Sequence, residues 1–314
     1  MAEKIIVIAG PTASGKTAMS LELAKKYKGE IVSADSMQIY RRMDIGTAKA
    51  TAAERAAAPH HMLDVAEPGE DYSVARYVEE AGRCCDDILA RGKLPIVTGG
   101  TGLYIDSLLS GRDFAEARQD SAVRERLERE FDALGGEAML ERLRQTDPER
   151  AAKLNLGDRR RIIRALEVFE LTGETITEHD ERTKRIPPRY DAAFIVMNRA
   201  DRAELYGRID RRVDMMIAEG LEQEVRALLA SGLSPDCTAM QAIGYKEMAE
   251  HVAGRMSLSE AAELIKQQSR RYAKRQLTWF RRREGALWIN LGPDCDMDKA
   301  RQLSSEFLAS RGIS

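Results

Sequence analysis

The chain has 314 residues, of which 43% are hydrophobic and 32% are charged, which fits one large or two ordinary folded domains and excludes a disordered chain. The formal net charge of −2 excludes a uniformly basic nucleic-acid-binding protein, but it leaves room for local basic clusters. No run approaches the ~18 apolar residues of a membrane span, and the four cysteines fit no zinc-site spacing. We therefore expect a cytoplasmic protein with reduced thiols and no membrane contact.

Short apolar runs alternate with helical patterns along much of the chain. Five of these runs are rich in β-branched residues and are predicted as strands: residues 4–9, 30–34, 94–98, 193–197 and 286–291. A helix is predicted over residues 17–27. Strands that alternate with helices predict an α/β fold with a parallel sheet flanked by helices.

The segment from about residue 120 to 183 is helical in period and contains no convincing strand. Pro187 and Pro188 mark the return to the sheet near Tyr190. We therefore predict an all-helical insertion domain over residues 119–189, inside an α/β domain of residues 1–118 and 190–314. Further helices are predicted in the C-terminal third: residues 203–218, 221–230, 246–252 and 258–280.

A phosphate-binding motif follows the first predicted strand. The sequence matches G-x-x-x-x-G-K-[ST] and opens the first helix, which is the context that this P-loop motif requires. Backbone N–H groups at a helix N-terminus point at the anion, a lysine adds a positive charge, and a hydroxyl can ligate Mg²⁺. The residues are Gly10, Pro11, Thr12, Ala13, Ser14, Gly15, Lys16 and Thr17.

Two further loops follow predicted strands at the same edge of the sheet, where ligands bind in open α/β folds. The first carries Asp35, which could be a magnesium ligand, a general base or a helix N-cap. The second begins with Gly99 and Gly100, which allow close approach of a ligand, and adds the hydroxyl of Thr101. Position alone does not choose between the roles of Asp35.

A set of ordered motifs resembles the bacterial tRNA dimethylallyltransferase (tRNA isopentenyltransferase) family. The motifs span nearly the full chain, and several are long and specific. One departure is Ala50, where the family usually has proline. The motifs are GPTASGKT, SADSMQIYR, DIGTAK, PHH, GGTGLYI, RRIIRALEVFELTG, QAIGYKE and YAKRQLTWFR.

The resemblance implies a P-loop NTPase-like fold and a transfer of the dimethylallyl group from dimethylallyl diphosphate to the N6 amine of adenine at tRNA position 37. Asp35 is expected to take the proton from the amine, with Thr101 and Arg208 near the reacting groups. The phosphate loop is expected to hold the departing diphosphate, with Thr17 on Mg²⁺. We expect a monomer.

The expected tRNA contacts lie in four parts of the chain. Residues 35–38 are expected to meet the extruded adenine, and the amide of Gln38 suits bidentate pairing with that base. The basic segment 270–283 interleaves cations with aromatics, whose rings we assign mainly to the core. The helical insertion is expected to grip the anticodon stem-loop. The assigned residues are Asp35, Ser36, Met37, Gln38, Thr101, Arg124, Arg159, Arg160, Arg161, Ile162, Ile163, Arg164, Gln241, Lys246, Arg270, Lys274 and Arg275.

Three alternatives are compatible with a P-loop. A small-molecule kinase would bind ATP here, but no kinase-like lid is recognisable. An adenylate isopentenyltransferase would prenylate free nucleotides, and it needs no anticodon-binding insertion. An RNA-binding GTPase-like switch would need a guanine-reading NKxD motif, which the sequence lacks.

Overall fold

The computed structural model describes residues 2–110 and 121–314. The chain divides into two compact units, of which the first comprises Met1–Leu109 with Arg189–Ser314 and the second comprises Ser110–Pro188. We call them the catalytic unit and the helical unit and describe each by itself. The predicted entry to the insertion, between residues 118 and 119, lies outside the described residues.

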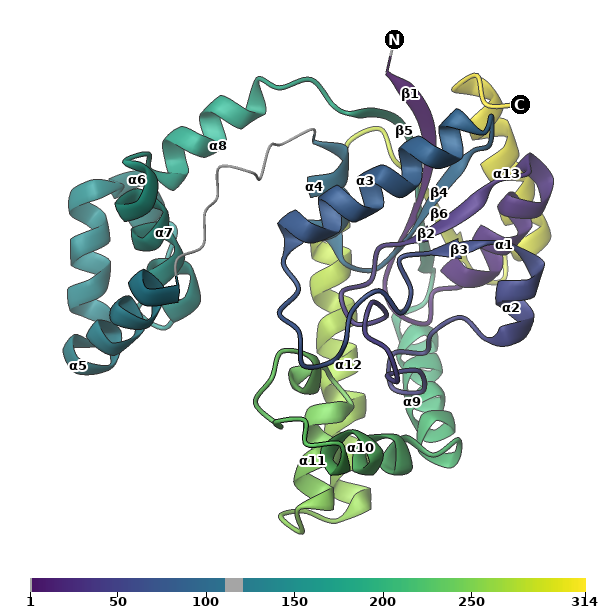
Figure 1. Cartoon of the computed structure of the whole chain (residues 1–314). Coiled ribbons are helices and arrows are strands. Elements are labelled where there is room, and N and C mark those ends of the chain that lie inside the picture. The colour runs from purple at the N-terminus through teal and green to yellow at the C-terminus, as the bar shows by residue number, and fades with distance from the viewer. Residues whose placement is uncertain (1, 111–120) are drawn as a thin grey trace. The chain divides into compact units, whose positions relative to one another are not determined.

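In the described part of the catalytic unit, six strands form one fully parallel sheet in the order β3-β2-β4-β1-β5-β6 (Figure 1). The predicted α/β class is confirmed, but the short edge strand β3 was not predicted from the sequence. Two histidines carry too little hydrophobic pattern to mark a strand. The strands are β1 (Glu3–Ala9), β2 (Glu30–Ser33), β3 (His60–His61), β4 (Pro95–Gly99), β5 (Tyr190–Arg199) and β6 (Leu287–Leu291).

The register of the central strands brings three loops to one edge of the sheet. Ala9 at the end of β1 pairs with Gly99 of β4, and Ser33 at the end of β2 pairs with Thr98 of β4. The phosphate loop, the Asp35 loop and the glycine loop therefore start at the same level. This edge is where the candidate site forms.

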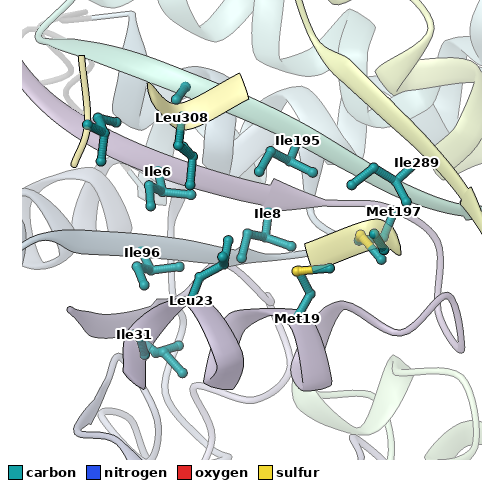
Figure 2. Packing of buried hydrophobic residues seen from close by; sticks show 14 of the residues in the cluster. Ile6, Ile8, Met19, Leu23, Ile31, Ile96, Ile195, Met197, Ile289 and Leu308 are labelled. Carbon is teal, nitrogen blue, oxygen red and sulfur yellow. The ribbon is translucent and has the colours of Figure 1, made fainter. Parts of the chain in front are cut away.

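One face of the sheet is covered by α1 (Lys16–Tyr27) and α13 (Met297–Ser310), as Figure 2 shows for the side chains between them. Ile6 and Ile8 alternate along β1 to point into this layer, where they pack with Leu23. Burial of large aliphatic side chains contributes about 1.5–3 kcal/mol each. The layer therefore fixes the start of α1, and with it the phosphate loop.

Other helices of the catalytic unit include α2 (Ala52–Ala57), α3 (Val74–Ala90) and α4 (Gly102–Leu109). None of these three helices, nor α13, was predicted from the sequence. Helix α3 is amphipathic and has a Ser73 N-cap whose side chain accepts from the backbone N–H of Arg76, so its pattern was present but overlooked. None of the described helices is long and apolar enough to cross a membrane.

A second hydrophobic cluster holds the C-terminal helices against the loop that follows Asp35. It includes Ile39 and Met43 of that loop, Val213 of α9, Val225 of α10 and Ile265 of α12. These helices were predicted within a few residues of their observed bounds. They are α9 (Arg202–Ala218), α10 (Leu221–Ala230), α11 (Tyr245–Val252) and α12 (Leu258–Phe280); the short 3-10 turn η1 (Ala239–Gln241) was not predicted.

The described part of the helical unit contains helices and no strand, as predicted. The first element is broken at Gly135, which has a φ of 79°, so residues on either side form separate helical segments. Its own core includes Leu127, Leu143, Ile162 and Leu166. The elements are α5 (Ser121–Thr146), α6 (Pro148–Ala151), α7 (Arg159–Thr172) and α8 (Ile176–Lys184).

Candidate active site

The phosphate loop connects β1 to α1. Gly10 has a φ of 145°, and a Cβ placed there would lie 2.1 Å from the carbonyl oxygen of Met197, so the loop passes too close to β5 for any side chain. Ala13 takes a left-handed φ of 62°, which is unfavourable for a residue with a side chain. Such strain is common where a loop is shaped for a ligand.

The polar groups of this loop are arranged for an anion. The hydroxyl of Ser14 is buried and has no hydrogen-bond partner in the described residues. The Nζ of Lys16 donates to the carbonyl of Pro11 at 2.6 Å. Burial, together with the positive charge of Arg212, lowers the pKa of Lys16 to about 7, although the Asp35 carboxylate opposes this shift. A bound phosphate group would satisfy the hydroxyl and stabilise the ammonium.

Asp35 lies just after β2, where its Oδ1 accepts from the backbone N–H groups of Met37 at 2.9 Å and Gln38 at 3.4 Å. These bonds form a local turn that fixes the orientation of the carboxylate. Its Oδ2 has no hydrogen-bond partner among the residues that the structure describes. The helix N-cap role considered for Asp35 is not found, because the next helix begins only at Ala52; the turn uses one oxygen and leaves the other available.

Thr101 stands behind the Asp35 loop. Its Oγ1 accepts from the backbone N–H of Ser36 at 3.0 Å and lies 3.4 Å from the hydroxyl of Ser36. Burial and the negative charge of Asp35 raise the pKa of Tyr272 to about 12, so the phenol stays protonated at neutral pH. Thr101 thus supports the loop, whereas Tyr272 lines the cavity next to it.

Gln276 of α12 joins two of the three loops. Its Oε1 accepts from the backbone N–H of Thr12 at 3.0 Å, and its Nε2 donates to the carbonyl of Gly100 at 3.0 Å. The side chain is 5% exposed. The sequence offered a signal for it, since a polar residue stands between the buried positions Ala273 and Phe280 of a helix, but that signal was not used.

A cavity of about 360 Å³ opens where these loops meet. Its volume suits a small ligand. Several residues predicted for the diphosphate and for the tRNA line it together, and they come from segments far apart in the chain. These are Thr12, Lys16, Thr17, Asp35, Ser36, Met37, Gln38, Gln241 and Arg275.

Arg208 and Arg212 lie one turn apart on α9. Arg208, which the resemblance named, donates from Nε to the carbonyl of Ala13 at 3.1 Å and lines a neighbouring groove. Arg212 lines the cavity itself, and no ion-pair partner for it exists among the described residues. Burial lowers the pKa of Arg212, while the charge of Asp35 raises it. The i,i+4 spacing from Arg208 was the sequence signal for this missed residue.

The amide of Gln38 is bonded to the protein. Its Nε2 donates to the carbonyls of Thr47 and Ala48, each at 3.2 Å, and its Oε1 accepts from the hydroxyl of Ser33 at 3.1 Å. Both amide hydrogens are therefore used. This corrects the predicted bidentate pairing with adenine, because no hydrogen of the amide remains for the base.

The loop that receives Gln38 is itself held by a carboxylate. Glu224 of α10 accepts from the backbone N–H groups of Asp44 at 2.8 Å, Ile45 at 2.9 Å and Gly46 at 3.2 Å. Tyr245 donates its hydroxyl to the same carboxylate at 2.5 Å. These bonds fix the segment whose residues Gly46, Thr47 and Ala48 form a wall of the cavity.

Comparison with known proteins decides the family. The family model described as IPP transferase matches residues 38–283, and the model described as isopentenyl transferase matches residues 3–64. The tRNA dimethylallyltransferase of Acetivibrio thermocellus is 44% identical over 311 residues, which cover 99% of both chains. The chain belongs to the IPP transferase family. The predicted resemblance is thereby confirmed.

Solved structures of IPP transferases agree with this fold. The full-length tRNA isopentenylpyrophosphate transferase of Bacillus halodurans is 42% identical, with a TM-score of 0.74 over 98% of this chain and 96% of that one. A eukaryotic dimethylallyltransferase, described as acting on tRNA, is 29% identical, with a TM-score of 0.84 over 100% of this chain and 81% of that one. The P-loop NTPase-like class predicted from the sequence is confirmed.

The remaining residues that the resemblance assigned to tRNA in the catalytic unit of this IPP transferase differ in their surroundings. Arg270 is paired with Asp210, and the guanidinium of Arg275 lies 5.4 Å from the centre of the Tyr272 ring beside the cavity. Lys246 and Lys274 are exposed and have no ion-pair partner among the described residues. Only Arg275 and Gln241 of the assigned polar residues beyond the loops reach the cavity.

The helical unit of this IPP transferase requires a correction. Ile162 is 0% and Ile163 is 2% exposed, and both belong to its core, so they cannot contact tRNA directly. Arg164 bonds the buried carboxylate of Glu167 at 2.8 Å, whereas Arg159 bonds Asp132 with Nη2 at 3.0 Å in a solvent-exposed pair.

Other arginines of the helical unit are more available. Arg124 pairs with Glu128 at 3.2 Å, one turn along α5, where both side chains are exposed to solvent. Arg160 and Arg161 are exposed at the start of α7, and Arg161 lies 3.8 Å from Asp158. Surface pairs of this kind contribute about 0–1 kcal/mol, so a phosphate can compete for these arginines.

Proposed function

We propose that the chain transfers a dimethylallyl group from dimethylallyl diphosphate to the N6 amine of adenine at position 37 of tRNA, releasing diphosphate. The observation that most directly supports this proposal is that Asp35, Lys16 and Thr17 line one cavity of about 360 Å³. A carboxylate base and an anion-binding loop therefore face the same space. Membership of the IPP transferase family and the relatives named tRNA dimethylallyltransferase support this proposal over a small-molecule kinase.

The reaction requires two things of the site: removal of a proton from the amine and stabilisation of the leaving diphosphate. The adenine amine is a poor nucleophile because its lone pair is delocalised into the ring, so it must lose a proton as it attacks. The new bond forms between N6 and C1 of the allyl group, the C1–O bond breaks, and the electron pair leaves with diphosphate. Asp35 accepts the proton through Oδ2, a contribution of about 10²–10⁴-fold.

The cations stabilise the departing diphosphate. Lys16 and Arg212 both line the cavity, and the buried Ser14 hydroxyl lies in the loop that cradles the phosphates. Donors fixed in place before the reaction stabilise developing charge without reorganisation. Tyr272, which is protonated at neutral pH and lines the same cavity as Asp35, would contribute a further donor.

Mg²⁺ fits this set of residues. Thr17 is exposed at the cavity, and Mg²⁺ is usually bound by one or two protein oxygens together with phosphates. Thr17 would hold the ion with the substrate diphosphate, and the ion would neutralise charge on the phosphate oxygens.

The tRNA partner follows from the same proposal. The helical unit, residues 110–188, would contact the anticodon stem-loop through Arg124, Arg160 and Arg161, which present exposed guanidinium groups. Residues 35–37, with Gln241 and Arg275, would line the path of the extruded adenine. We place the enzyme in the cytoplasm, acting as a monomer.

The test mixes the purified chain with radiolabelled dimethylallyl diphosphate, Mg²⁺ and an anticodon stem-loop carrying adenine at position 37. Free AMP and ATP with a small acceptor are offered in parallel. Label in the RNA supports the proposal, label in AMP assigns the free-nucleotide reaction, and phosphate transfer from ATP assigns a kinase.

The variant Asp35→Asn distinguishes a role of Asp35 as the general base from a role in binding the RNA. The asparagine oxygen can still accept the N–H groups of Met37 and Gln38, so the turn is retained. Transfer to RNA is expected to fall about 10²–10⁴-fold with RNA affinity unchanged. A variant with undiminished transfer would remove Asp35 from its proposed role.

A further inference from the structure

A groove of about 880 Å³ lies beside the catalytic cavity in the catalytic unit. It is lined by part of the phosphate loop, by α9 and by residues 44–55, which lead from the wall of the catalytic cavity into α2. We call it the outer groove. Among the residues that line it, the sequence gave roles only to Ala13, Thr17 and Arg208.

The outer groove and the catalytic cavity meet next to the phosphate loop. The residues that line both are Thr17, Ala48, Arg212 and Met216. Asp35 lines only the catalytic cavity, whereas Arg208 and Met215 line only the outer groove. A diphosphate bound at the phosphate loop therefore adjoins two spaces, and only one of them contains the carboxylate proposed as the base.

Helix α9 presents one continuous face to the outer groove. The residues of this face recur at spacings of three and four, which places them on one side of the helix. They are Arg208, Arg211, Arg212, Met215, Met216 and Glu219. The arginines come first, beside the phosphate loop, where Arg208 bonds the carbonyl of Ala13. The lining therefore changes from cationic to apolar along the helix.

The cationic end of this face suits the same anion as the phosphate loop. Within the described ranges, Arg208, Arg211 and Arg212 have no carboxylate as an ion-pair partner. Neighbouring like charges repel one another, so an anion bound between them is stabilised. One diphosphate site can thus serve a ligand whose chain lies in either space.

The other end of the outer groove is apolar. Met216 and Ile45 pack, partly buried, against the second hydrophobic cluster, and Met215 beside them is 59% exposed. Three methyl groups of the segment 44–55 complete this part, those of Ala48, Ala50 and Ala52. Apolar side chains gathered in a groove mark a site for an apolar ligand, and methionine adapts well to an irregular one.

The cations of the segment 44–55 are already engaged by the protein. Nζ of Lys49 bonds Asp44 and Asp64, each at 2.7 Å, and the lysine side chain is 1% exposed. Arg55 bonds Asp64 at 2.9 Å. These cations are therefore not available to a ligand, and what the segment offers is its methyl groups.

The charge around the apolar end disfavours a polynucleotide. Glu54 and Glu219 both line the groove, and Glu219 lies one turn after the methionines on α9. Carboxylates at this place repel a chain of phosphates, because like charges brought together are unfavourable. A hydrocarbon chain carries no charge and meets no such repulsion.

The dimensions of the two spaces separate short from long chains. Met216 lies roughly 6 Å beyond Arg212 and roughly 12 Å beyond Arg208 along the helix axis, at 1.5 Å per residue. A ten- or fifteen-carbon chain attached to a diphosphate can extend over both ends of this face. The catalytic cavity, of about 360 Å³, has to hold the adenine together with the allyl group, which leaves no room there for a longer chain.

We propose that the outer groove binds the hydrocarbon chain of longer allylic diphosphates, of ten or fifteen carbons, whose diphosphate occupies the phosphate loop. The inference rests on the proposed function, since it assumes that this loop binds an allylic diphosphate. A ligand bound in this way has its chain outside the space that contains Asp35. It therefore transfers nothing to RNA and competes with dimethylallyl diphosphate.

The first experiment measures affinity for a chain-length series by titration calorimetry in the presence of Mg²⁺. The series is inorganic diphosphate, dimethylallyl diphosphate, geranyl diphosphate and farnesyl diphosphate. Affinity is expected to rise about tenfold for each five-carbon unit added beyond dimethylallyl, because apolar surface is buried. Geranyl diphosphate is also expected to inhibit RNA prenylation competitively with dimethylallyl diphosphate. Radiolabelled geranyl diphosphate, offered alone, is expected to leave the RNA unlabelled.

The second experiment changes the apolar end of the groove with Met215→Gln and Ala52→Gln. Both positions are exposed, and neither lines the catalytic cavity. Each variant is expected to weaken binding of geranyl diphosphate about fivefold, because a polar amide replaces apolar surface. The Michaelis constant for dimethylallyl diphosphate is expected to stay unchanged. The matched control is Ala218→Gln, at an exposed position of α9 that does not line the groove.

Three outcomes overturn the inference. Geranyl diphosphate could bind no more tightly than dimethylallyl diphosphate, the geranyl group could appear in the RNA, or both groove variants could bind geranyl diphosphate as tightly as Ala218→Gln does. Calorimetry does not depend on the transfer reaction. Failure of the unmodified enzyme to prenylate RNA would therefore contradict the proposed function alone, while loss of the chain-length effect in the variants would still support the groove.

Discussion

The side-chain oxygen of Gln276 accepts a hydrogen bond from the backbone N–H of Thr12 at 3.0 Å, across 264 positions of the sequence. The same amide donates to Gly100, so one side chain of α12 sets the separation of the phosphate loop and the glycine loop. This amide is a direct hydrogen-bonded link between the two loops, so their separation depends on it.

Replacement of Gln276 by alanine is expected to lower the transfer rate about tenfold and the free energy of unfolding by about 1–3 kcal/mol, because Thr12 N–H and the carbonyl of Gly100 lose their partner. Steady-state kinetics and thermal unfolding measure the two effects. Gln302→Ala, on the exposed surface of α13, serves as control and changes neither. An unchanged rate with a lowered melting temperature would reduce Gln276 to a purely structural role.

Binding of dimethylallyl diphosphate is expected to take up a proton at pH 8. Lys16 has a pKa of about 7 in the free enzyme, and a bound dianion raises that pKa, so the ammonium re-forms on binding. Affinity then falls as the pH rises above about 7. Titration calorimetry in buffers of different ionisation enthalpy measures the uptake. Lys16→Arg, which stays charged, is expected to bind without it, and equal uptake by both proteins would contradict this assignment.

The lowered pKa of Lys16 also makes the free energy of unfolding depend on pH. The unfolded chain, with an ordinary lysine pKa of 10.5, binds more protons than the folded one between about pH 7 and 10. Stability of the free enzyme is therefore expected to rise with pH across this window through Lys16. Denaturant unfolding at several pH values, compared between the unmodified chain and Lys16→Met, isolates the contribution. If the stability of the unmodified chain falls or stays level relative to that of Lys16→Met between about pH 7 and 10, the assignment is refuted.

Glu224→Gln is expected to lower kcat/KM for RNA about tenfold and to leave the Michaelis constant for dimethylallyl diphosphate unchanged. An amide offers one oxygen where the carboxylate offers two, so at least one backbone N–H of residues 44–46 loses its acceptor and the wall that holds Gln38 loosens. Glu222→Gln on the same helix, whose partner is Arg226, is the matched control. If kcat/KM falls equally for RNA and for dimethylallyl diphosphate, loosening of this wall does not act on the RNA substrate selectively.

Ile163→Ala is expected to destabilise the helical unit by about 2–5 kcal/mol, as do other large-to-small changes in a core. Arg160→Ala is expected to do the reverse, weakening RNA binding without changing the melting temperature. Thermal unfolding and RNA binding at a temperature where both variants are folded separate the two effects. If folded Ile163→Ala loses as much RNA affinity as Arg160→Ala, Ile163 contacts the RNA after all.

The sequence was most informative where a motif carries its own context. The strand, the glycines and Lys16 identified the phosphate loop, and the apolar run before Asp35 located that carboxylate at the correct edge of the sheet. These features depend on residues adjacent in the chain, so local pattern and elementary strand geometry were enough to place them.

The residues that sequence reasoning missed act across long separations. Arg212 and Tyr272 reach the cavity from helices that pack beside it only in the folded chain, and Glu224 supports a loop about 180 positions away. Ile162 was misassigned because a family motif does not distinguish core positions from contact positions, whereas the helical period of α7 does. For such residues, the position on the helix was the sequence signal that could have distinguished a buried side chain from an exposed one.

The backbone N–H of Arg189 donates to the carbonyl of Leu109 at 3.0 Å, so the chain leaves the catalytic unit and returns to it at neighbouring points. A segment whose two ends meet in this way is an insertion, and the fold of the catalytic unit does not depend on it. Residues 110–188 could therefore be exchanged for a short linker, or for another RNA-reading module, without reordering a single strand of the sheet. If the helical unit selects the RNA, as proposed, such an exchange would redirect prenylation to new RNA loops while the catalytic unit stays intact.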